Sequence, residues 1–102
     1  LKRAAIDHGI WPVVEWLNRD EDTYTLGSCQ GDEERSGRLA DHPFVTLRCW
    51  RFEAVIRAIR RFQPFADCTV NVYEDAGVVL AIQFKNRQSL RDVVAALRRE
   101  RT

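Results

Sequence analysis

The chain has 102 residues, of which 45% are hydrophobic and 30% are charged, as is typical of a soluble globular domain. Its formal net charge of +1 excludes strong attraction to nucleic acid through total charge alone. No apolar run approaches the roughly 20 residues of a membrane-spanning helix. We therefore expect a single cytoplasmic domain that needs no disulfides, with no signal peptide and no membrane partner.

The first predicted element is a short helix over about residues 12–18. Proline is tolerated in a first helical turn, so Pro12 predicts a break near residues 9–11 and a helix that begins there. The apolar residues of this segment recur at helical spacing and form one face: Ile6, Ile10, Val13, Val14 and Leu17.

A hairpin is predicted next. Residues 23–29 contain Thr and Tyr and favour a strand, residues 30–41 have no apolar period and predict a loop, and residues 42–50 alternate as a strand does. A helix follows, with an apolar stripe that ends before Pro64: Phe52, Val55, Ile56, Ile59 and Phe62.

The last third predicts a second hairpin and a final helix. Residues 68–73 and 78–84 favour strands, and residues 74–77 favour a turn in which Gly77 can adopt a positive φ. Asn86 or Ser89 can cap a helix whose apolar face is Leu90, Val93, Val94 and Leu97. The order α-β-β-α-β-β-α predicts a two-layer α+β fold, with a four-stranded, mostly antiparallel sheet and helices on one face.

Strand alternation predicts which side chains face the helices: Val45, Leu47, Cys49, Val70, Val72, Leu80 and Ile82. The opposite face then carries Thr46, Arg48, Trp50, Thr69, Asn71, Tyr73, Val79, Ala81 and Gln83. Arg48, Trp50 and Tyr73 on such a face can hold phosphates and stack bases, which indicates single-stranded RNA as a partner. Two alternatives stay open: this half-apolar face is a homodimer interface, or the N-terminal segment covers it with Trp11 and Trp16, which lie off the apolar stripe.

Gly27 and Gly31 bracket a Ser-Cys pair at the end of the first strand. Glycine gives the backbone freedom to turn, so consecutive N–H groups here could bind an anion, with Ser28 and Gln30 as further donors. The alternative is a plain connecting loop.

Antiparallel pairing of the first two strands places Cys29 opposite roughly Phe44 and near His42. Cys29 as the thiol, His42 as the base and Asp41 as the orienting carboxylate would suit nucleophilic catalysis. The alternative is a small residue at a strand end beside a surface histidine. Cys49 falls opposite roughly Tyr24, about 16 Å away by the strand rise. That spacing excludes a Cys29–Cys49 disulfide, and no metal site is predicted.

The segments Ile-Trp-Pro-Val-Val-Glu-Trp-Leu-Asn at 10–18 and Tyr-Thr-Leu-Gly-Ser-Cys-Gln-Gly at 24–31 resemble the start of the wybutosine-synthesis tRNA methyltransferase family. The resemblance covers about 20 residues and centres on Ser28, Cys29 and Gly31. It implies a tRNA or S-adenosylmethionine site at these residues; no other cofactor is indicated.

The sequence thus predicts a binding or accessory module with a ligand site at the Ser-Cys-x-Gly loop. The alternatives are an enzyme related to tRNA-modifying methyltransferases and a structural homodimer.

Overall fold

The computed structural model describes residues 9–29, 42–73 and 77–100. They form three helices and four strands in the predicted order: α1 (Trp11–Asn18), β1 (Thr23–Cys29), β2 (Phe44–Cys49), α3 (Phe52–Phe62), β3 (Ala66–Tyr73), β4 (Gly77–Phe84) and α4 (Arg87–Glu100). The predicted turn at 74–76, the loop at 30–41 and Ile6 lie outside the described residues.

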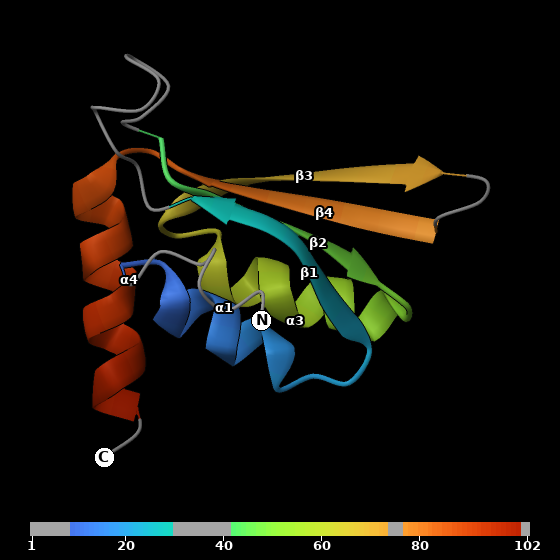
Figure 1. Ribbon diagram of the computed structural model, residues 1–102, viewed down its shortest axis with the longest axis horizontal. Coiled ribbons are helices and arrows are strands. Elements are labelled where there is room, and N and C mark those ends of the chain that lie inside the picture. Colours follow the sequence, from blue (N-terminus) through green and yellow to red (C-terminus); the bar gives the residue numbers. More distant parts are fainter. Residues whose placement is uncertain (1–8, 30–41, 74–76, 101–102) are drawn as a thin grey trace.

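The strands form one antiparallel sheet in the order β1-β2-β4-β3, so β1 and β3 are its edges. Figure 1 shows α1 and α3 beneath one face of the sheet and α4 standing at one end of it. The predicted α+β fold with helices on one face is confirmed.

Local sequence explains where the helices begin and end. Pro12 lies in the first turn of α1, where its missing N–H costs nothing. The helix α3 ends at Phe62, two residues before Pro64. At the start of α4, the Ser89 backbone N–H donates to Asn86 Oδ1 at 2.8 Å, so Asn86 is the capping residue.

The hydrophobic core lies between the sheet and all three helices. Phe62 of α3 is fully buried and meets Trp16 of α1 edge-to-face at a centroid distance of 5.4 Å. It meets Phe84 of β4 in the same way at 6.2 Å. The Phe62 side chain therefore connects α1 and α3 with the sheet.

Two valines predicted to be buried are exposed. Val70 and Val72 are 44% and 77% exposed, although the register puts them on the helix-facing side, opposite Leu80 and Val78. The physical reason is position: β3 is an edge strand with a neighbour on one side only, and the end of the β3–β4 hairpin extends beyond the helix layer (Figure 1). Phe52, at the start of α3, is 70% exposed instead of completing the apolar stripe.

The two tryptophans of α1 do not cover the other face of the sheet. Trp11 and Trp16 are partly buried against the core on the helix side. The alternative in which they cover the half-apolar face is therefore wrong, because α1 packs on the opposite side of the sheet. None of the described helices is long and apolar enough to cross a membrane.

Candidate functional site

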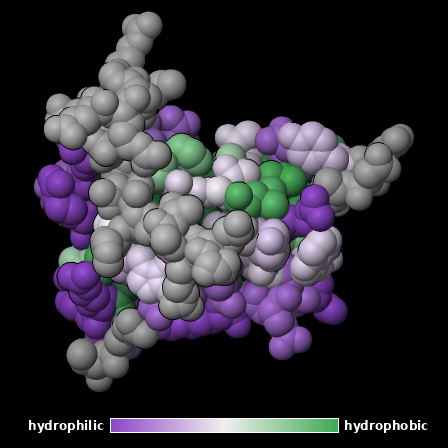
Figure 2. All heavy atoms as spheres, in the orientation of Figure 1, coloured by the Kyte–Doolittle hydropathy of each residue, from purple (hydrophilic) through white to green (hydrophobic). Residues whose placement is uncertain are grey.

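The face of the sheet that points away from the helices is called the open face here. The register confirms its predicted members, since Thr46 pairs with Ala81 and Arg48 with Val79 across β2 and β4, and β1 and β3 add Tyr24, Cys29 and Tyr73. In Figure 2, which has the orientation of Figure 1, the surface over the strands is mainly pale or green. The strongly hydrophilic, purple surface lies along the helices.

Aromatic side chains gather at one end of the open face. Tyr24 is 61% exposed and pairs with Arg48, and Trp50 is 56% exposed just beyond β2. Tyr73 is 51% exposed and pairs with Gly77. Because Cys49 pairs with Val78, the next residue, Trp50, lies level with Gly77. Glycine has no side chain, so the register leaves a gap between Trp50 and Tyr73.

Arg48 lies between Tyr24 and Trp50 in this aromatic cluster, which comprises Tyr24, Arg48, Trp50 and Tyr73. Its guanidinium carbon is 5.2 Å from the centre of the Trp50 ring, within cation–π distance. Its Nε is buried and has no hydrogen-bond acceptor among the described residues. A buried donor without a partner is costly to the fold.

The predicted loop site lies at the other end of the same face. Cys29 pairs with Phe44, as predicted, and the exposed His42 comes two residues earlier. Ser28 pairs with Val45 and so faces the helix side, away from Cys29. Gln30, Gly31 and Asp41 lie outside the described residues, so the predicted anion loop and the complete catalytic group remain predictions.

A shallow pocket of about 260 Å³ opens at this loop end, lined by His42, Phe44, Thr46, Ala81, Ile82 and Gln83. Cys29 is not among the described residues that line it. Arg48 lies four residues beyond Phe44 along β2, about 13 Å by the strand rise. The structure therefore places the predicted residues at two ends of one face instead of in one cleft.

The other two cysteines belong to the scaffold. Cys49 pairs with Thr23, one residue from the predicted partner, because β1 bulges between Thr25 and Gly27. Burial raises the pKa of the Cys49 and Cys68 thiols, which disfavours the reactive thiolate. Within residues 9–29, 42–73 and 77–100, no three His, Cys, Asp or Glu side chains cluster to hold a metal ion.

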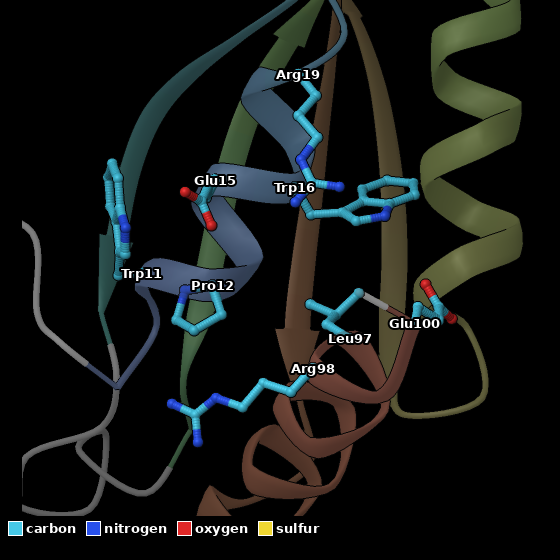
Figure 3. A pocket seen from close by; sticks show the side chains of 8 residues that line it. All are labelled: Trp11, Pro12, Glu15, Trp16, Arg19, Leu97, Arg98 and Glu100. Atoms are coloured by element: carbon cyan, nitrogen blue, oxygen red, sulfur yellow. The ribbon is translucent and has the colours of Figure 1, made fainter. Parts of the chain in front are cut away.

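A pocket that the sequence did not predict lies on the helix side, between α1 and the end of α4 (Figure 3). Its volume is about 410 Å³, and its lining is Trp11, Pro12, Glu15, Trp16, Arg19, Leu97, Arg98 and Glu100. Acidic and basic side chains are mixed, so the lining does not select one ligand charge. The sequence shows Arg98 and Arg99 near the end of α4. It does not show that Trp16 of α1 lines the same pocket, because that depends on how the two helices pack.

These features define a small α+β domain with an open, partly aromatic sheet face. No protein family model matches the chain, and no significant match was found among curated proteins or solved structures. The resemblance to the wybutosine-synthesis family at Ser28, Cys29 and Gly31 therefore stays a prediction.

Proposed function

We propose that this protein is a binding module that holds a short single-stranded RNA segment on its open face. The observation that carries the proposal is the aromatic cluster: three exposed rings share one sheet face with Arg48, of which Trp50 contacts it and Tyr24 pairs with it. Stacking surfaces combined with an arginine are the usual means of binding single-stranded nucleic acid on a sheet.

The geometry allows two bases to stack in sequence. Trp50 and Tyr73 lie on either side of Gly77 at the same level of the sheet. A base that stacks on either ring can use the free space over the glycine, and the neighbouring Tyr24 offers a further ring beside Arg48. Stacking does not require a particular base, so we expect little sequence preference at this end.

Arg48 supplies the contact to the RNA backbone. Its planar fork can bind a phosphate through two N–H donors. Asp67 lies at the far end of the same face, opposite Gln83, so the charge on the face favours phosphate at the Arg48 end. With one or two phosphates contacted, the salt dependence of binding should be shallow, with a slope of about −1.

The loop end would extend the site. The pocket formed by His42, Phe44 and Gln83 can accept an unstacked base, with a ring at Phe44 that is 40% exposed and an amide for hydrogen bonding. Gln30 and Gly31, two of the predicted donors, follow Cys29 in the sequence and lie outside the described residues, whereas Ser28 faces the helix side. The ligand site predicted at this loop is therefore proposed as one end of the RNA path.

The proposal is tested by fluorescence anisotropy with a labelled eight-nucleotide oligouridine at low salt. Trp50→Ala and Tyr73→Ala should each weaken binding about tenfold, since loss of one stacked base costs about 1–3 kcal/mol. Arg48→Gln should weaken binding and flatten the salt dependence.

Phe52→Ala is the matched control, because Phe52 is an exposed aromatic residue (70%) that belongs to α3 and not to the sheet. It should bind RNA as the wild type does. The absence of binding by the wild type at low salt, or equal losses in Phe52→Ala and Trp50→Ala, would rule the proposal out.

We also propose that the protein forms a homodimer, but not by covering the open face. The open face is rich in groups that suit a ligand, whereas the most exposed aliphatic side chain, Val72, lies at the β3 edge of the sheet on its helix-facing side. The surface that we propose for the dimer is the outer edge of β3.

A further inference from the structure

The outer side of β3 is an unprotected sheet edge. β3 pairs with β4 on one side over its full eight residues, without a bulge, and no described strand pairs with the other side. Proteins usually protect such edges with lysine, proline or a bulge. The strand contains no Lys, Arg or Pro, while the opposite edge strand, β1, does carry a bulge.

The exposed part of this edge is also apolar. Val70 and Val72 are the exposed valines of the hairpin, and both face the helix side, Val70 in the middle of β3 and Val72 near its end. A strand edge with free backbone groups and exposed β-branched side chains is a template for a further strand.

We propose that a second copy of this chain pairs with β3, strand against strand and antiparallel, about a two-fold axis that passes through Val70. The product is a continuous eight-stranded sheet. The inference does not depend on RNA binding, because it uses the edge of the sheet and not its open face.

The sequence of β3 matches itself in this register. Val70 lies opposite Val70 of the second copy, Cys68 lies opposite Val72, and Thr69 lies opposite Asn71. Residues directly opposite each other in an antiparallel pair share a face. Apolar residues therefore meet apolar residues on the helix side, polar residues meet polar residues on the open face, and both helix layers stay on one side.

Each copy supplies what the other lacks. Cys68, near the start of β3, is half-buried against the core, whereas Val72, near its end, has nothing described beneath it. Antiparallel pairing places the uncovered Val72 beside the covered Cys68 of the other copy. Phe65, which also packs against the core, immediately precedes the strand at that end.

Charges do not oppose the pairing. Asp67, the charged residue of the strand, falls opposite Tyr73 of the second copy and not opposite itself. Like charges directly opposite each other would destabilise the pair. The open faces of the two copies then continue into one another, with Tyr73 of each beside the seam.

The size of the contact predicts a reversible dimer. The seven paired residues, 67–73, span about 23 Å along the seam. A single strand pair with its flanking side chains buries less than the roughly 1,600 Å² of a standard stable interface. We therefore expect dissociation on the order of micromolar concentrations, and a closed dimer because each copy has only one such edge.

The first experiment measures mass by light scattering over a range of protein concentrations. The wild type should rise from 11.9 kDa towards twice that mass. Val72→Lys should stay monomeric at every concentration, with an unchanged circular dichroism spectrum because the side chain is 77% exposed.

Leu26→Lys is the matched control, since Leu26 is 47% exposed on the other edge strand; it should still dimerise. A wild type that is monomeric throughout, open-ended oligomers, or a dimer abolished by Leu26→Lys but not by Val72→Lys would each overturn the proposal.

The second experiment tests the register by cross-linking. A cysteine at position 70 would face its own copy across the axis at about 4.5–5.5 Å between Cα atoms, which suits a disulfide. Val70→Cys should therefore give a covalent dimer on mild oxidation, well above the wild type with its native cysteines.

Thr69→Cys lies on the same strand but opposite Asn71 and should cross-link little. Efficient cross-linking of Thr69→Cys with none for Val70→Cys would contradict the proposed axis.

Discussion

Gly77 is the one described residue whose backbone has a positive φ, at +75°. An added Cβ would meet no heavy atom within 4 Å. A Gly77→Ala variant should therefore lose stability through the backbone alone. The left-handed conformation costs about 1–2 kcal/mol for a residue with a Cβ, partly offset by a stiffer unfolded chain. We expect a loss of about 1 kcal/mol in chemical denaturation.

Gly27 provides the comparison for this measurement. It also lies in a strand with open space around its Cα, but its φ is not positive. Gly27→Ala should be neutral or slightly stabilising, because alanine loses less conformational entropy on folding. Equal losses at both positions would show that conformation at Gly77 is not the cause.

At the scale of elements, the connection between α1 and β1 is tied to both layers. Asp20 Oδ2 accepts a hydrogen bond from Arg57 Nε of α3 at 3.0 Å, and Asp20 Oδ1 accepts the Asp22 backbone N–H at 3.0 Å. The backbone N–H of Trp50 donates to the backbone carbonyl of Asp22 at 2.7 Å. This connection thereby fixes the end of the sheet where the aromatic cluster lies.

This tie predicts a pH dependence. The hydrogen bond from Arg57 lowers the pKa of Asp20 and is the largest effect; burial opposes it, and the backbone hydrogen bond from Asp22 lowers the pKa further. A lowered folded-state pKa contributes stability above the unfolded value of about 4 and loses it as pH falls through the folded value. Arg57→Gln should thus unfold at a slightly lower temperature than the wild type at neutral pH, with the difference vanishing in acid.

The size of this effect should be modest, because the Arg57 side chain is 54% exposed and solvent screens the pair. Arg60→Gln is a suitable control on the same helix, since Arg60 is exposed and differs only in lacking the contact with Asp20. A thermal shift for Arg57→Gln that persists unchanged at acid pH would mean that the ion pair does not stabilise the fold.

The elements themselves could be predicted because each is encoded locally. Period 3.6 in α3, alternation in β2 and a capping residue at Asn86 need no tertiary information. The exposure of Val70 and Val72 could not be predicted in this way. It depends on how far the hairpin extends past α3, which is a relation between two elements distant in sequence.

The candidate site shows the same division. Alternation predicted that Arg48, Trp50 and Tyr73 share a face, and the register confirms it. The loop residues were predicted separately, as a group around Cys29 and His42 at the end of the first strand. The structure separates the two groups along β2, because the hairpin runs the length of the sheet between them.

At the scale of the whole molecule, one core serves every element. The buried residues of α1, α3, α4 and three of the strands belong to a single cluster, including Val13, Val55, Leu80 and Val93. A site on the open face is therefore built on a sheet whose other side is fully supported where the helices reach. Only the end of the β3–β4 hairpin lacks that support, which is where we place the second copy.

A single core predicts that the protein unfolds in one cooperative transition at concentrations where it is monomeric. Phe62→Leu tests this, because Phe62 touches Trp16 of α1 and Phe84 of β4. It should lower the free energy of unfolding by about 1–2 kcal/mol, less than full truncation to alanine. The unfolding midpoints measured by circular dichroism and by tryptophan fluorescence should shift together to lower denaturant concentration.

Phe52→Leu, at a 70% exposed position on the same helix, is the control and should change stability by less than about 0.5 kcal/mol. Separate midpoints for the two probes would mean that the helix layer and the sheet unfold independently, and that Phe62 does not couple them.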